Sequence, residues 1–99
     1  MKARAAIVTG GTKGIGFAIA QRLVRDGMGV YICARDRDEI EKAVAQLSES
    51  GDCFGKVCDV RDEEQVKGLL NSCESRFGGV DVLINNAGVG YMGKTVEEL

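Results

Sequence analysis

Residues 9–16 read Thr9-Gly10-Gly11-Thr12-Lys13-Gly14-Ile15-Gly16 and form a glycine-rich turn between two segments of different character. The segment before the turn, Ala5–Val8, is a short apolar run that predicts a buried strand. The segment after it, Gly14–Asp26, is amphipathic, and Gly27 stands where a helix would end. Its aliphatic residues recur at helical spacing: Ile15, Ile19 and Leu23. We therefore expect a strand, a tight turn and a helix in that order.

The same alternation continues along the chain. Further strands are expected at residues 29–33, 53–58 and 80–85, and the strand at 29–33 is apolar enough to be buried on both faces. Further helices are expected from Asp36 or Asp38 to Gly51 and from Asp62 to Phe77. Strands joined by helices of this length predict an α/β fold, with right-handed crossovers and a parallel sheet covered by helices on both faces.

Composition excludes several classes of protein. The chain has 99 residues, a net charge of −2 and no histidine, so neither a basic nucleic-acid-binding face nor the usual zinc spacing is expected. No apolar run is long enough to cross a bilayer or to act as a signal peptide, which favours a cytoplasmic protein without a membrane partner. The four cysteines are expected to be reduced and to pack as small hydrophobic side chains.

The glycine-rich turn is suited to bind a phosphate. Unpaired backbone N–H groups at a helix start, together with the positive end of the helix dipole, attract an anion. Glycine lets the anion approach the backbone and permits positive φ angles, and Gly16 is expected to let the helix pack closely on the strands. The spacing Gly-x-x-x-Gly-x-Gly differs from both Gly-x-Gly-x-x-Gly and the P-loop. A tight turn without a ligand remains the alternative.

Three motifs together resemble the short-chain dehydrogenase/reductase family. Residues 9–16 look like its TGxxxGxG motif, Asp59-Val60 follows the third strand where the family has an Asp near the adenine, and residues 85–88 match its NNAG motif. The similarity runs through essentially the whole chain. It implies that residues 1–99 are the N-terminal part of one dinucleotide-binding domain. The implied sheet is of Rossmann type but incomplete, with about four strands in the order 3-2-1-4.

This strand order places a ligand crevice between strands one and four, at their carboxyl ends. Ala87 and Gly88 would leave room there for a ribose, and the amides of Asn85 and Asn86 can tie neighbouring strand ends together. The Asn pair has a purely structural alternative as a brace of the sheet. Asp59 has one as a residue favoured by the dipole at a helix start.

Two basic residues favour NADP(H) over NAD(H). Arg35 stands after the second strand, where an NAD-binding site usually has a carboxylate, and Lys13 lies in the glycine turn. In the resembled family, basic residues at these two positions accompany NADP(H), and Thr12 adds a hydroxyl donor. Asp36 supports the alternative, since its carboxylate can reach a ribose. The predicted cofactor-binding residues are Gly10, Thr12, Lys13, Gly14, Ile15, Gly16, Arg35, Asp59, Val60, Asn86, Ala87 and Gly88.

The catalytic residues of the resembled family are a Ser and a Tyr-x-x-x-Lys motif, and neither is expected in this chain. Tyr31 and Tyr91 are followed four residues later by Arg35 and Thr95. A capping box at residues 95–98 opens a further helix. We therefore expect that this chain is the cofactor-binding segment of an oxidoreductase and that it is inactive alone. The full-length protein is expected to be a homo-oligomer that acts on a carbonyl or alcohol. The alternative is a non-catalytic nucleotide-binding half-domain or interaction module.

Overall fold

The computed structural model describes residues 4–86 of the chain. Four strands alternate with three helices in this part: β1 (Ala5–Thr9), α1 (Gly14–Arg25), β2 (Gly29–Ala34), α2 (Arg37–Leu47), β3 (Cys53–Val57), α3 (Glu63–Phe77) and β4 (Val82–Asn85). The predicted sites at Ala87 and Gly88, Tyr91 and the capping box at residues 95–98 lie outside the described residues.

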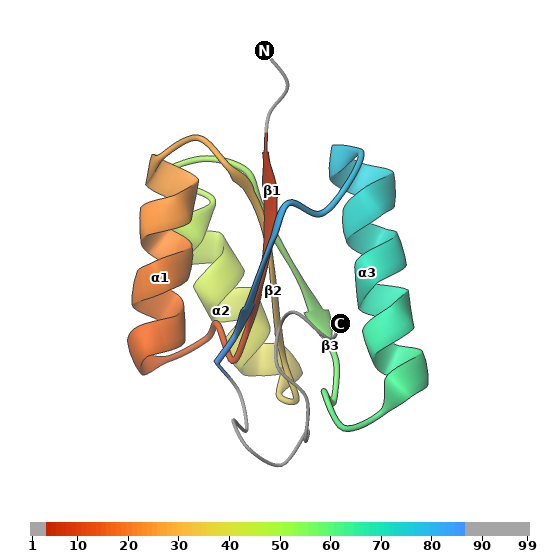
Figure 1. Ribbon diagram of the computed structural model, residues 1–99. Coiled ribbons are helices and arrows are strands. Elements are labelled where there is room, and N and C mark those ends of the chain that lie inside the picture. The colour runs from red at the N-terminus through yellow and green to blue at the C-terminus, as the bar shows by residue number, and fades with distance from the viewer. Residues whose placement is uncertain (1–3, 87–99) are drawn as a thin grey trace.

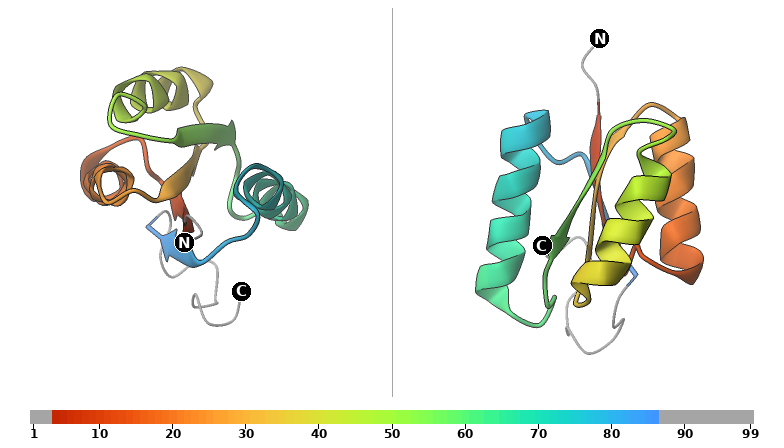
Figure 2. Two further views of the ribbon diagram at one scale, coloured as in Figure 1. Left: turned by 90° about the horizontal axis from the view of Figure 1, so that it is seen from above. Right: turned by 180° about the vertical axis from the view of Figure 1, so that it is seen from behind.

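The four strands form one parallel sheet in the order β3-β2-β1-β4, which confirms the predicted order. Helices α1 and α2 cover one face of the sheet, and α3 covers the other (Figures 1 and 2). From β1 the chain adds β2 and then β3 on one side of β1, through α1 and α2. It then passes through α3 and adds β4 on the other side of β1, so the strand order reverses between β1 and β4. The carboxyl ends of all strands lie at one edge, at the bottom of Figure 1.

The two central strands supply the centre of both hydrophobic layers. Alternate side chains of a strand point to opposite faces, so Val8 and Ile32 pack beneath α1 and α2, whereas Ile7 and Cys33 pack beneath α3. Every residue of β1 is buried, and so are all residues of β2 except the last. The prediction that the second strand is buried on both faces is confirmed.

The aliphatic residues that recur in α1 pack only in part against the sheet. The buried residues of α1 are Gly16, Ala20 and Val24, whereas Ile15 is 72% exposed. Small side chains let the helix lie close to the sheet, and the larger Ile19 and Leu23 pack at the margin of the same cluster. Aliphatic spacing found the helix but not the line of closest contact.

Helix boundaries differ slightly from those predicted. Asp36 rather than Asp38 is the N-cap of α2, and that helix ends at Leu47 rather than at Gly51. Helix α3 ends at Phe77, where Gly78 adopts a left-handed conformation with φ of 87°. No helix within residues 4–86 is long and apolar enough to cross a membrane.

The four cysteines are free and buried, in agreement with the prediction. Burial raises the pKa of Cys33 to about 12 and that of Cys53 to about 12. The thiols of Cys33 and Cys58 also contact each other, and this contact raises the pKa of Cys33 further. A buried thiol with a raised pKa is a poor nucleophile because the thiolate is the reactive form.

We therefore expect these four cysteines to resist alkylation in the folded protein. At pH 8 in iodoacetamide, peptide mapping by mass spectrometry should show each of them modified at least about a hundredfold more slowly than in guanidinium chloride. The unfolded sample is the control, since there every thiol is accessible. Rapid labelling of Cys33 or Cys53 without denaturant would contradict the burial described above.

Candidate dinucleotide-binding site

The glycine-rich turn lies at the carboxyl ends of the strands, directly beside the end of β2. The Gly10 N–H donates a hydrogen bond to the Cys33 carbonyl oxygen at 2.9 Å. Gly10 and Gly14 have φ angles of 64° and 56°, a region that side-chain-bearing residues rarely adopt. The prediction that the turn needs glycine for its backbone angles is confirmed at these two positions.

Gly16 holds the start of α1 against the turn that precedes it. A Cβ atom at Gly16 would overlap the carbonyl oxygen of Gly10, and it would lie 2.7 Å from Nδ2 of Asn86. The expected close packing of Gly16 is therefore present, but its closest neighbours are the turn and Asn86 rather than the body of a strand. This contact fixes the direction in which the first turn of α1 points.

The first turn of α1 is uncapped, in contrast to the other helices of residues 4–86. Asp36 caps α2 and Asp62 caps α3, each through a carboxylate that accepts two backbone N–H groups, and each helix has two acidic residues in its first turn. Among the described residues, no side chain caps α1 and its first turn contains no acidic residue. Uncapped amides beside a glycine turn fit the pyrophosphate of a dinucleotide.

Asn85 and Asn86 join the ends of β1 and β4. The Thr9 hydroxyl donates to Asn85 Oδ1 at 3.1 Å and accepts the Asn86 backbone N–H at 2.9 Å. The Asn86 amide donates through Nδ2 to the Gly10 carbonyl oxygen at 3.4 Å. The bracing role predicted for the Asn pair is present, and contact with a ligand remains a prediction. Sequence reasoning missed Thr9, although its place at the end of the first strand was a usable signal.

Lys13 and Thr12 both contact a carboxylate of α2. Lys13 Nζ lies 3.1 Å from Glu39 Oε2, and the Thr12 hydroxyl donates to Glu39 Oε1 at 3.3 Å. Both groups were predicted to approach a phosphate, and here they are held by one side chain that the sequence analysis did not single out. The Lys13 side chain is nevertheless 73% exposed, so it lies at the surface of the turn.

Arg35 and Asp36 follow β2 at the same edge of the sheet. Register pairs Thr9 with Cys33, which places the residues after each strand side by side. Arg35 is exposed, whereas Asp36 accepts the N–H groups of Asp38 and Glu39 through Oδ1 at 2.9 and 3.2 Å. Because the Asp36 carboxylate caps its own helix, it is a weaker candidate for a ribose contact than Arg35 is for a phosphate.

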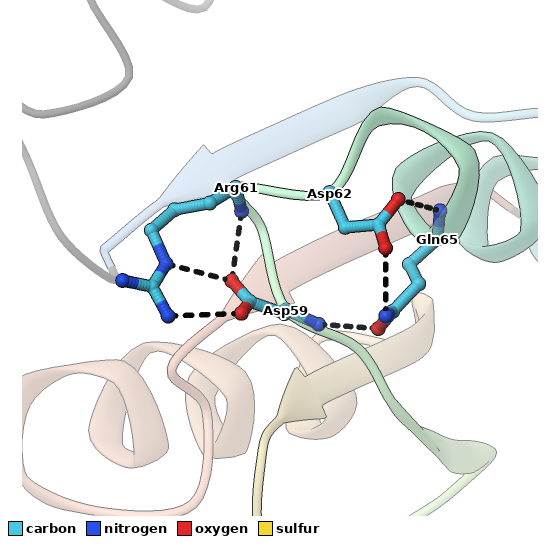
Figure 3. Close-up of polar contacts among 4 residues, drawn as sticks. All are labelled: Asp59, Arg61, Asp62 and Gln65. Atoms are coloured by element: carbon cyan, nitrogen blue, oxygen red, sulfur yellow. Dashed lines mark hydrogen bonds and ion pairs between the residues drawn. The ribbon is translucent and has the colours of Figure 1, made fainter.

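The Asp59 carboxylate is bound by Arg61, and the Asp59 backbone N–H donates to Gln65 Oε1 in the first turn of α3 at 2.8 Å (Figure 3). Arg61 donates to the Asp59 carboxylate from Nε, Nη2 and the backbone N–H at 3.1, 3.0 and 2.9 Å. These Arg61 hydrogen bonds lower the pKa of Asp59 from 3.8 to about 2, and the charge of Arg35 contributes in the same direction. Asp62 caps α3, so the alternative reading of Asp59 as a helix-start residue is wrong.

Among the remaining predicted residues, Val60 is half-buried and Ile15 is exposed. Val60 lines a small apolar pocket with Thr9 and Asn85 on the α3 side of the sheet. Tyr31 is only 8% exposed, and its ring packs 5.9 Å from Phe54 and 6.2 Å from Phe77 between centroids. This packing assigns Tyr31 to the core and agrees with the expectation that it is not a catalytic residue.

The close contact at Gly16 generates a stability prediction. Gly16→Ala should lower the free energy of unfolding by about 1–3 kcal/mol, because the new methyl group collides with a backbone carbonyl that cannot rotate away. Gly68→Ala is the matched control: Gly68 also lies in a helix, but the nearest atom to its added Cβ is 3.9 Å away. That change should raise stability by about 0.5–1 kcal/mol. Urea denaturation measures both, and equal effects would contradict the contact.

The Asp59–Arg61 pair generates a titration prediction. Because the pKa of Asp59 is lowered to about 2, its contribution to stability is present above about pH 4 and is lost as pH falls toward 2. The carboxyl ¹³C signal of Asp59 should titrate near pH 2, and Arg61→Gln should move this midpoint toward 3.8. Arg37→Gln, at another exposed arginine, is the control. A wild-type midpoint near 3.8 would contradict the pairing.

Comparison with known proteins agrees with this geometry. The model of the short chain dehydrogenase family matches residues 4–99. A putative ketoacyl reductase of granaticin polyketide synthesis from Streptomyces violaceoruber is 44% identical over 93 residues, covering 93% of this chain and 34% of that protein. The chain spans about a third of the length of the curated relatives that it matches.

Solved structures show the same arrangement. An actinorhodin polyketide ketoreductase with NADPH superposes with a TM-score of 0.84 and 36% identity, over 99% of this chain and 40% of that one. An NAD+-bound xylitol dehydrogenase superposes with a TM-score of 0.83 and 38% identity, over 88% of this chain and 34% of that one. The match of the family model to nearly the whole chain, together with the uncapped glycine-turn helix, shows that the chain belongs to the short-chain dehydrogenase family of oxidoreductases.

Proposed function

We propose that this chain is the NADP(H)-binding N-terminal part of an oxidoreductase that transfers hydride between the nicotinamide and a small carbonyl or alcohol. The observation that carries the proposal is the start of α1, where uncapped amides follow a turn with two left-handed glycines. The family accommodates either cofactor, since one structural neighbour was solved with NADPH and another with NAD+. The choice of NADP(H) therefore depends on this chain's own charges.

Each part of the cofactor has candidate partners in this chain. The amides of the glycine turn and of the first turn of α1 would hold the pyrophosphate. Lys13 and Arg35 would hold the 2′-phosphate, which carries close to two negative charges and matches the planar fork of an arginine. Val60 and Asp59 would border the adenosine, and Asn86 would keep the end of β4 in register with Gly10, since its amide already reaches that carbonyl.

When bound, the cofactor supplies the hydride. What this chain contributes is binding and orientation, because residues 1–99 contain no Tyr-x-x-x-Lys motif, the motif that carries the general acid in the resembled family. In this proposal the groups that protonate the substrate oxygen belong to a part of the protein beyond residue 99, as they do in the resembled family. The 99 residues alone are accordingly expected to bind the cofactor without reducing a carbonyl.

Cofactor preference provides the test. In the full-length protein, NADP+ should bind more tightly than NAD+, and Arg35→Asp should shift the ratio of their dissociation constants toward NAD+ by about ten- to hundredfold. The shift follows because the change removes charge-assisted hydrogen bonds and adds a repulsive carboxylate. Fluorescence or calorimetric titration measures both constants.

Arg25→Asp is the matched control for this test. It makes the same change from a positive to a negative charge, but in the last turn of α1, at the end of that helix away from the glycine turn. The control should leave the ratio of the two dissociation constants within about twofold of wild type, because charges farther apart than a Debye length are screened. A ratio that Arg35→Asp leaves unchanged would contradict the assignment of Arg35, and a wild-type preference for NAD+ would contradict the choice of cofactor.

A further inference from the structure

Glu39 contacts two polar side chains of the glycine turn, Lys13 and Thr12. One of its carboxylate oxygens lies 3.1 Å from Lys13 Nζ, and the other accepts the Thr12 hydroxyl at 3.3 Å. These residues are 26 and 27 positions away in the chain, so the contact joins the β1–α1 turn to the first turn of α2. A carboxylate held by an ammonium and a hydroxyl has the same sign of charge as a phosphate group and accepts hydrogen bonds from the same kinds of donor, although it carries only one negative charge.

We propose that Glu39 is a specificity-determining residue: it takes the place of the 2′-phosphate on Lys13 and Thr12 in the free protein and competes with that phosphate for them. The inference rests on the proposed NADP(H) function and deepens it. The single hydroxyl donor of Thr12 can bind the phosphate only after it leaves Glu39. The positive charge of Lys13 is shared with Glu39 as long as the ion pair persists, and a carboxylate that stays nearby repels the dianion. Glu39 therefore weakens NADP+ binding, whereas NAD+ carries no phosphate at this position and is not affected.

The local structure allows such an exchange. The backbone of Glu39 is fixed because its N–H donates to the cap residue Asp36. Its side chain is 37% exposed, and that of Lys13 is 73% exposed, so the ion pair has solvent on one side. An exposed ion pair is worth little and breaks without unfolding its surroundings. The carboxylate can thus rotate into water while α2 and the glycine turn keep their positions.

A simpler role for Glu39 is to stabilise α2 through the helix dipole. Asp38 and Glu39 are the two acidic residues in the first turn of that helix, and Asp38 is exposed. Each contributes to the dipole interaction to a similar degree. Of these two acidic residues, only Glu39 contacts Lys13 and Thr12 within the described residues 4–86. Asp38→Asn is therefore a matched control that removes a charge from the same turn without releasing the glycine turn.

The experiment compares Glu39→Gln, Asp38→Asn and wild type in the full-length protein. Dissociation constants for NADP+ and NAD+ are measured by titration, and thermal melting without cofactor checks that the variants fold. Glu39→Gln should lower the Kd for NADP+ by about three- to tenfold and change that for NAD+ by less than about twofold. Asp38→Asn should change both constants by less than about twofold, with a melting temperature similar to that of Glu39→Gln.

Three results would overturn the inference. The first is an NADP+ affinity that Glu39→Gln leaves unchanged or weakens. The second is an equal change for NADP+ and NAD+, since a competitor for the 2′-phosphate cannot act on a cofactor that lacks it. The third is the same selective gain in Asp38→Asn, which would assign the effect to the net charge of the helix start. A wild-type protein that prefers NAD+ contradicts the proposed function itself, and then the inference falls with it.

Discussion

The contact between Gly16 and the Gly10 carbonyl is the constraint on which the candidate site depends. Because no Cβ atom fits there, the first turn of α1 lies directly against the turn that ends β1. The amide of Asn86, at the end of β4, reaches the same carbonyl oxygen. The turn that ends β1, the start of α1 that follows it, and the distant end of β4 are thereby held together at one point. Their common position directs the uncapped amides of α1 toward the carboxyl edge of the sheet, where the strand order reverses.

The distribution of carboxylates complements that geometry. The helices α2 and α3 begin with an Asp cap and further acidic residues, so their N-termini are already neutralised. Two acidic side chains near the edge also have basic partners: Asp59 is bound by Arg61, and Glu39, in the first turn of α2, is paired with Lys13. Within residues 4–86, α1 is thus the helix whose positive end has no protein carboxylate in its first turn. An anionic ligand meets no acidic side chain in that first turn, although Glu39 of α2 lies against the preceding glycine turn.

Sequence patterns predicted the sheet well because they depend on local physics. Strand and helix alternation, the glycines at Gly27 and Gly78, and the capping residues Asp36 and Asp62 each report on a few neighbouring residues. In α1 the large aliphatic side chains gave the helical spacing but not the line of closest contact with the sheet. The actual contact line needs small residues, so Ile15 is exposed while Ala20 is buried.

The polar partners in the candidate site were beyond the reach of these patterns. Glu39 had no local signal that would pair it with Lys13. The place of Thr9 at the end of the first strand indicated its edge of the sheet but not its partners Asn85 and Asn86. Both pairings join elements that meet only after the sheet has formed. Asp59 was predicted as a site residue, but its hydrogen bonds with Arg61 were not. Two charged residues close together in a loop interact only if the loop conformation brings their side chains together.

The sequence by itself determined the order of strands and helices, the glycine turn and the family resemblance, because each is written in the spacing of neighbouring residues. Tertiary structure alone decided which face of α1 is buried, which carboxylate holds Lys13, and how the ends of β1 and β4 are tied. The physical reason is that these contacts depend on crossovers that bring distant segments within a few ångströms, and neither propensity nor periodicity carries that information.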